Sequence, residues 1–227
     1  MRLTFLGHAA FLLATGEVTI AVDPFMTGNP AAPDLPVQAD YIMVSHGHAD
    51  HLGDAVTIAR QSGGTVVAVY ELANHCARQG AKVHAMHIGG SHDFGYFKVK
   101  LTPALHGSSL GSEQGPAEYL GNPCGFLITV KDKTIYHAGD TGLFGDMALL
   151  GRLHNIDAAL LPIGDNFTMG PADALEAVKL LQPRLVVPMH YNTWPLIAQQ
   201  PAEFKKAVEE QTAAQVIILQ PGESFAL

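Results

Sequence analysis

The strongest signal in the chain lies between Tyr41 and His51, which read Tyr-Ile-Met-Val-Ser-His-Gly-His-Ala-Asp-His. The first four residues form a short apolar run of the kind that makes a buried strand. Three imidazoles and one carboxylate follow at once, on His46, His48, Asp50 and His51. Imidazole is the commonest protein ligand for zinc and related ions, and carboxylate suits the same metals. The spacing therefore predicts a metal site at the mouth of a strand, and argues against a polar loop with unrelated histidines.

The pattern His46-x-His48-x-Asp50-His51 resembles the signature of the metallo-β-lactamase superfamily of dinuclear hydrolases. That resemblance implies two divalent metal ions per chain and seven ligands: His46, His48 and His106 for the first ion, Asp50, His51 and His190 for the second, and Asp140 bridging both. Zinc is the expected metal. Manganese, iron and nickel are alternatives, because nitrogen and carboxylate ligands serve all four.

The strand pattern supports the same grouping independently of the resemblance. His106 follows an apolar stretch by a short step, Asp140 follows Thr134 to His137, and His190 ends the run that begins at Leu185. Ligands at the ends of apolar runs can converge at one edge of a sheet. We therefore expect all seven to meet at one place.

Short β-branched runs alternate with amphipathic segments in both halves of the chain. This favours an α/β protein with two packed sheets and helices on both outer faces, and the resemblance implies a four-layer αββα fold. The length suits a single domain spanning residues 1–227. The sequence predicts a hairpin from Phe126 to His137, a helix from Leu143 to His154, a strand from Val216 to Leu219 and an irregular stretch from His106 to Pro123.

Further motifs extend the resemblance over essentially the whole chain. They are Gly7-His8-Ala9, Val22-Asp23-Pro24-Phe25, Met86-His87-Ile88-Gly89-Gly90, His137-Ala138-Gly139-Asp140-Thr141-Gly142, Pro162 to Gly170 and Pro188-Met189-His190-Tyr191-Asn192-Thr193. Together they resemble an uncharacterised family of metal-dependent hydrolases that is similar to the ascorbate-6-phosphate lactonases and, more distantly, to N-acyl-phosphatidylethanolamine phospholipases. The resemblance leaves the substrate unassigned.

Five residues are candidates for roles around the metals. Asp23, at the end of a strand, is expected to accept a hydrogen bond from a ligand histidine and so fix its tautomer. His137 is a candidate for the same role, with a structural role as the alternative. His8 is predicted to bind substrate or donate a proton to a leaving group, or else to be structural. Asn166 and Asn192 are candidates for substrate contact or for holding their loops in shape.

Composition narrows the choice of partners. The formal net charge is -8, with 13 Lys and Arg against 21 Asp and Glu, and no basic run occurs. This argues against nucleic acid and anionic membrane surfaces as partners. Two distant cysteines and the absence of a long apolar run favour a cytoplasmic protein. A small-molecule substrate is expected, and a homo-oligomer remains open. His75, in a helical segment, is expected to be exposed.

These expectations combine into one mechanism. A hydroxide shared by the two ions would attack a small ester, lactone or phosphoester, with a lactone as the leading specific substrate. Asp50 would be catalytic as well as a ligand. The alternatives are an RNA phosphodiester hydrolase, which the acidic charge argues against, and a non-catalytic metal-binding scaffold, which the complete ligand set argues against.

Overall fold

The computed structural model describes residues 1–112 and 115–227, and the strands in these ranges form two large mixed sheets and a small ribbon. The first sheet contains, in spatial order, β16 (Ser224–Ala226), β1 (Arg2–Phe5), β2 (Phe11–Ala14), β3 (Thr19–Val22), β4 (Tyr41–Met43), β5 (Thr65–Val69) and β6 (Lys82–Met86). The second contains β15 (Gln215–Val216), β14 (Leu185–Met189), β13 (Ala158–Pro162), β12 (Lys133–His137), β11 (Cys124–Val130), β8 (Lys98–Pro103) and β7 (Ser91–Asp93).

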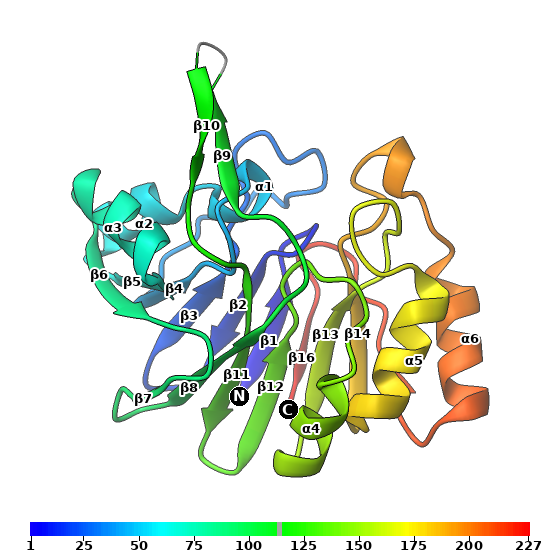
Figure 1. Cartoon of the computed structure of the whole chain (residues 1–227). Coiled ribbons are helices and arrows are strands. Elements are labelled where there is room, and N and C mark those ends of the chain that lie inside the picture. The colour runs from blue at the N-terminus through cyan, green and yellow to red at the C-terminus, as the bar shows by residue number, and fades with distance from the viewer. Residues whose placement is uncertain (113–114) are drawn as a thin grey trace.

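Helices cover the outer faces of both sheets (Figure 1). α2 (Ala55–Ser62) and α3 (Tyr70–Arg78) flank the first sheet, while α4 (Met147–Leu153), α5 (Pro171–Leu181) and α6 (Pro201–Gln211) flank the second. Strands β5 and β13 are buried along their whole length and, apart from Thr65, apolar, as expected of strands covered on both faces. The expected four-layer αββα arrangement is confirmed. Among the described residues, no helix is both long and apolar enough to cross a membrane.

The strand directions bring distant segments to one edge. β3 to β6 run parallel to one another, as do β12 to β15, so the carboxyl ends of each set lie on the same side of its sheet. β1 and β8 each reach their parallel set through one antiparallel neighbour and therefore point the same way. The loops after β1, β3, β4, β8, β12 and β14 carry the candidate metal ligands and most of the other site candidates, together with the short helix α1 (Ala49–Leu52). His137 ends β12, and Asn166 follows β13.

Several predicted elements differ in extent from those observed. The hairpin from Phe126 to His137 is confirmed, with Ile128 opposite Ile135. The predicted helix from Leu143 starts only at Met147, because the preceding backbone is held against another loop by the hydrogen bond from Gly142 N to Leu105 O. The predicted strand at Val216 to Leu219 is mostly irregular.

The stretch from His106 to Pro123 is not a plain loop. β9 (Ser109–Ser112) and β10 (Gly115–Tyr119) form an antiparallel hairpin that projects beyond the sheets, while residues 113 and 114 lie outside the described ranges (Figure 1). At its base, Glu118 accepts a hydrogen bond from His75 Nδ1 at 2.9 Å and pairs with Arg78. The prediction that His75 is exposed was wrong: His75 is buried, and its ring nitrogens contact Glu118 of the hairpin and Gln79 at the end of α3.

Candidate metal centre

The first group of candidate ligands consists of His46, His48 and His106. Each offers a ring nitrogen, and the three nitrogens lie within 4.8 Å of one another. His46 Nε2 and His48 Nδ1 are 2.9 Å apart. His46 and His48 sit on the loop after β4, and His106 arrives from the loop after β8. The structure thus brings together three ring nitrogens that are separated by up to 60 residues in the chain.

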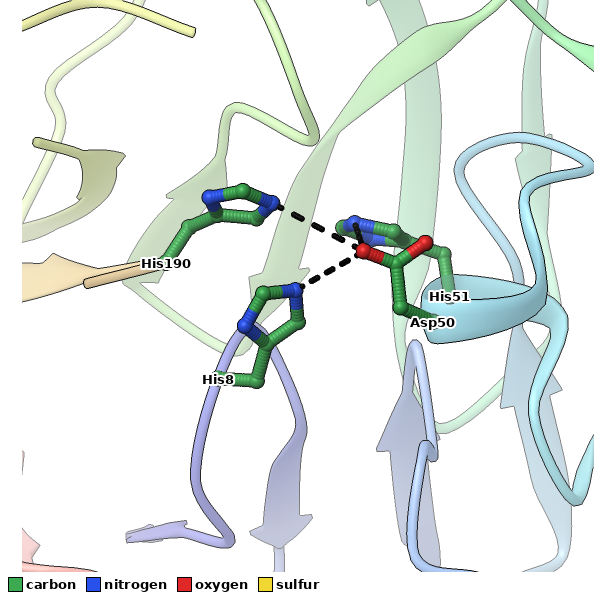
Figure 2. A group of neighbouring side chains, drawn as sticks. All are labelled: His8, Asp50, His51 and His190. Atoms are coloured by element: carbon green, nitrogen blue, oxygen red, sulfur yellow. Dashed lines mark hydrogen bonds and ion pairs between the residues drawn. The ribbon is translucent and has the colours of Figure 1, made fainter. Parts of the chain in front are cut away.

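The second group consists of Asp50, His51 and His190, with His8 beside them (Figure 2). Figure 2 shows the ring nitrogens of His8 and His190 directed at one oxygen of Asp50. That oxygen, Oδ2, lies 3.1 Å from His8 Nε2 and 3.9 Å from the Nε2 atoms of both His51 and His190. The side chains of His8, His51 and His190 are buried, whereas Asp50 is partly open.

Asp140 lies between the two groups. Its Oδ2 is 3.0 Å from His190 Nε2, 3.2 Å from His51 Nε2 and 3.6 Å from His106 Nε2. Asp140 follows Gly139, whose positive φ of 62° and close packing on Ser45 leave no room for a side chain. A Cβ at Gly139 would lie 2.6 Å from Cys124 O of the neighbouring strand β11 and 3.0 Å from Ser45 Cβ, which follows β4 of the other sheet, so the backbone can pass between them only because the residue is glycine. The turn at Gly139 thus places the Asp140 carboxylate beside both histidine groups.

Asp23 holds the histidine loop in place. Its Oδ2 accepts from His51 Nδ1 at 2.8 Å and from Ser45 Oγ at 2.6 Å, and its Oδ1 accepts from Ser45 N at 2.7 Å. Ser45 Oγ in turn lies 3.0 Å from His46 Nδ1. Because the serine proton goes to the carboxylate, the serine oxygen accepts from His46. Asp23 therefore fixes the ring of His51 directly and that of His46 through Ser45, a residue that the sequence analysis did not single out.

These hydrogen bonds leave the opposite ring nitrogens free for a metal. When His51 donates a hydrogen bond from Nδ1 to Asp23, its Nε2, which faces Asp140, is the nitrogen that a metal ion would bind in place of a proton. Among the described residues, His51 Nε2 and Asp140 Oδ1 are buried without a hydrogen-bond partner. Buried polar atoms without partners are costly, and metal coordination is one way of satisfying them. The donor set of imidazole and carboxylate fits a transition-metal ion.

The electrostatics of the cluster are strongly coupled. Burial alone would lower the pKa of His51, but Asp140 and Asp23 outweigh it and raise that pKa well above its usual value. Burial would raise the pKa of Asp140, yet His51 and His190 hold it well below its usual range. Burial, and next the charge of His51, lower the pKa of His46. The same negative potential that attracts a proton to His51 would attract a metal cation.

The remaining candidates from the sequence fall into two sets. His137 donates from Nε2 to Ala9 O at 2.9 Å and accepts from Gly139 N at 3.1 Å. These contacts fit the structural alternative for His137, because backbone groups occupy both of its ring nitrogens. Asn192 is exposed, and its Oδ1 accepts from Gln199 N at 2.7 Å, which closes its own loop. Asn166 is also exposed, at a positive φ of 51°. Among the described residues, no hydrogen bond joins either asparagine to the cluster.

Comparisons with known proteins agree with this arrangement. A family model described as a beta-lactamase superfamily domain matches residues 2–190. A UPF0173 metal-dependent hydrolase from Desulforamulus reducens is 70% identical over 224 residues, which covers 98% of both chains. The protein of the same name from Pelotomaculum thermopropionicum is 65% identical over 229 residues and covers 100% of both.

A solved structure gives the same result. Igni18, described as a novel metallo hydrolase from the hyperthermophilic archaeon Ignicoccus hospitalis, matches with a TM-score of 0.89 and 38% identity, over 100% of this chain and 98% of that one. The extent of these matches and the metal-binding cluster lead to one conclusion. The chain has the metallo-β-lactamase fold and belongs to the beta-lactamase superfamily, within the UPF0173 family of metal-dependent hydrolases.

Proposed function

We propose that the protein binds two divalent metal ions at this centre and uses them to hydrolyse a small ester, lactone or phosphoester. The observation that carries the proposal is the position of Asp140, whose Oδ2 lies within 3.6 Å of nitrogens from both histidine groups. A site for two adjacent ions requires a carboxylate that can reach both of them. A site for one ion would need only one of the two histidine groups.

The residues divide between the two ions by proximity. His46, His48 and His106 would hold the first, Asp50, His51 and His190 the second, and Asp140 would contact both. Two such ions would supply a water nucleophile of lowered pKa and polarise the bond to be cleaved. Zinc is the metal that we expect, because neutral imidazoles dominate the donor set.

The chain itself controls access and orientation. His46, His51 and His190 are buried, while His48 and His106 are half-buried and Asp50 is partly open. Substrate would therefore approach across His48, His106 and Asp50. The buried side, fixed by Asp23 and Ser45, would keep the ligands in place during the reaction.

The experiment is a panel of substrates assayed on one preparation of protein, stripped of metal and then reloaded with zinc, manganese, iron(II) or nickel. The panel contains an aryl ester, several lactones, a phosphomonoester and a phosphodiester. We expect hydrolysis of at least one class that disappears on chelation, returns on reloading and is strongly reduced in His48→Ala. A rate that is equal in stripped and reloaded protein would contradict the proposal.

A further inference from the structure

His8 makes more hydrogen bonds in and around the candidate metal centre than a residue that only packs would need. Its Nε2 lies 3.1 Å from Asp50 Oδ2, and its Nδ1 lies 2.8 Å from Thr193 Oγ1. Its carbonyl oxygen accepts from His190 N at 2.7 Å. His8 follows β1 in the first sheet, whereas His190 and Thr193 follow β14 in the second. Three hydrogen bonds from one residue thus connect loops of both sheets across the centre.

The directions of the two side-chain hydrogen bonds follow from the groups involved. An ionised carboxylate can only accept, so the proton between Asp50 and His8 belongs to His8 Nε2. In a neutral ring the other nitrogen then carries only a lone pair. Thr193 must therefore donate its hydroxyl proton to His8 Nδ1. The opposite tautomer would place a lone pair on Nε2 against a carboxylate oxygen at 3.1 Å, which is repulsive.

The backbone around His8 is built for this position. His8 itself has a φ of 57°, an uncommon value for a residue with a side chain, and Gly7 before it has a φ of 94°. A Cβ at Gly7 would lie 2.9 Å from Ala31 O, so only glycine fits there. Local strain of this kind persists where the surrounding structure over-determines a residue, and it is concentrated at functional sites.

Two aromatic side chains close the ring of His8 off from solvent. The ring centroid of Trp194 lies 4.9 Å from that of His8, and the centroid of Phe25 lies 5.9 Å from it. The side chain of His8 is 0% exposed. Both ring nitrogens are occupied and the ring is covered, so His8 does not present a nitrogen to a substrate. This geometry differs from the proton-donor role that the sequence suggested.

We propose that Thr193 and His8 form a relay that positions Asp50: the hydroxyl of Thr193 fixes His8 as the Nε2-protonated tautomer, and that proton orients the Asp50 carboxylate for the second metal ion. The proposal rests on the proposed function only in that Asp50 is a ligand of that ion. Both Thr193 and His8 are positioning residues and do not touch substrate. Outer hydrogen bonds of this kind typically change metal affinity by about 10- to 100-fold when they are removed.

The first test needs no variant and no metal. In metal-free protein labelled with ¹⁵N-histidine, long-range ¹H–¹⁵N spectra distinguish the two neutral tautomers, and loss of a signal in His8→Gln assigns it. We expect His8 to carry its proton on Nε2. A proton on Nδ1 would overturn the relay whatever the protein hydrolyses.

The second test measures zinc binding by competition with a chromophoric chelator. Thr193→Val keeps the shape of the side chain and removes the hydroxyl, Thr193→Ser restores the hydroxyl, and Thr129→Val removes a half-buried threonine hydroxyl on β11, outside the cluster. We expect Thr193→Val to weaken the binding of one of the two zinc ions by about 10- to 100-fold. Thr193→Ser should bind within a few-fold of the parent, and Thr129→Val should bind as the parent does.

The outcomes separate the two proposals. Equal binding of both ions by Thr193→Val and the parent would overturn the relay while leaving the dinuclear centre standing. A parent that binds fewer than two ions would instead count against the proposed function, and this result does not depend on the Thr193 variants. Melting curves of each variant identify any loss of binding that comes from unfolding.

Discussion

The two candidate metal-binding groups differ in how firmly the protein holds their side chains. In the second group, His51 is hydrogen-bonded to Asp23, and Asp50 is hydrogen-bonded to the ring of His8. The backbone N–H of His190 also donates a hydrogen bond to the carbonyl oxygen of His8. In the first group only His46 has such support, through Ser45. Within the part of the chain that the structure describes, neither His48 nor His106 donates a hydrogen bond to a supporting carboxylate or carbonyl.

The ligands that are held most firmly are therefore not the ones that a substrate would meet first. In the well-supported group, His51 and His190 are buried and only Asp50 is partly open, and this pre-organisation favours tight binding of an ion. In the other group, only His46 is buried, and His48 and His106 lie at the opening, where they can adjust as a substrate arrives. We therefore expect the ion at the first group to leave first when a chelator is added.

Asp140→Ala removes the carboxylate that contacts both groups. We expect both ions to bind weakly and hydrolysis to fall by roughly 10⁴-fold, about 5.5 kcal/mol of transition-state stabilisation. Metal content and rate should be measured on the same preparation. Retention of two ions with full activity would remove Asp140 from the centre.

His48→Ala should affect the first group alone. Occupancy is expected to fall to about one ion per chain, and hydrolysis to fall by roughly 10²–10³-fold, because the second group keeps all its hydrogen bonds. Elemental analysis beside the assay is the measurement. A variant that loses both ions would show that the two groups are not separable.

Asp23→Asn should act mainly on the second group. Asn can accept only through one oxygen, so the hydrogen bonds to His51 and Ser45 cannot all be kept. We expect about 10- to 100-fold weaker binding of the second ion. Metal-free protein should also lose about 1–3 kcal/mol of stability, since Asp23 is fully buried. Denaturant unfolding with and without zinc measures both effects, and unchanged zinc affinity would refute the supporting role.

Asp157→Asn is a control variant outside the candidate metal centre, and it should leave metal binding and turnover unchanged. Asp157 accepts from Thr134 N, Lys133 Nζ and Arg184 NH1 at 3.0, 3.1 and 3.2 Å. Burial would raise its pKa, but the hydrogen bonds from Thr134 and Lys133 hold it below its usual value. Its stabilisation is therefore present above the unfolded-state pKa of about 4 and is lost as the pH falls through the folded-state pKa.

At neutral pH we expect a loss of about 1–3 kcal/mol of stability for Asp157→Asn. The difference from the parent should shrink at strongly acidic pH, which melting curves across pH would show. A variant that is equally destabilised at all pH values would indicate a packing defect in place of a lost charge.

Local spacing was enough to predict much of this molecule. The segment from His46 to His51 lies within one loop and one helical turn, so its metal-ligand pattern can be recognised from the sequence alone. The order of apolar runs predicted the layered fold because strands buried on both faces are largely apolar, as β5 and β13 are.

Contacts between distant segments were not predictable in the same way. Thr193 meets His8 across 185 residues, and nothing in its local sequence distinguishes it from a loop threonine. Ser45 could have been noticed as the residue before His46, but its bond to Asp23 depends on the pairing of β3 with β4. His75 is hydrogen-bonded to Glu118, which reaches it from a hairpin whose short strands carry no clear alternation.

The central claim is that one chain holds two ions in two groups joined by Asp140. The most direct test is a crystal structure of zinc-loaded protein with anomalous data collected at the zinc edge. The account predicts two anomalous peaks per chain, one among His46, His48 and His106 and the other among Asp50, His51 and His190, with Asp140 contacting both. A single peak in fully loaded protein would contradict it, as would a second peak away from these residues.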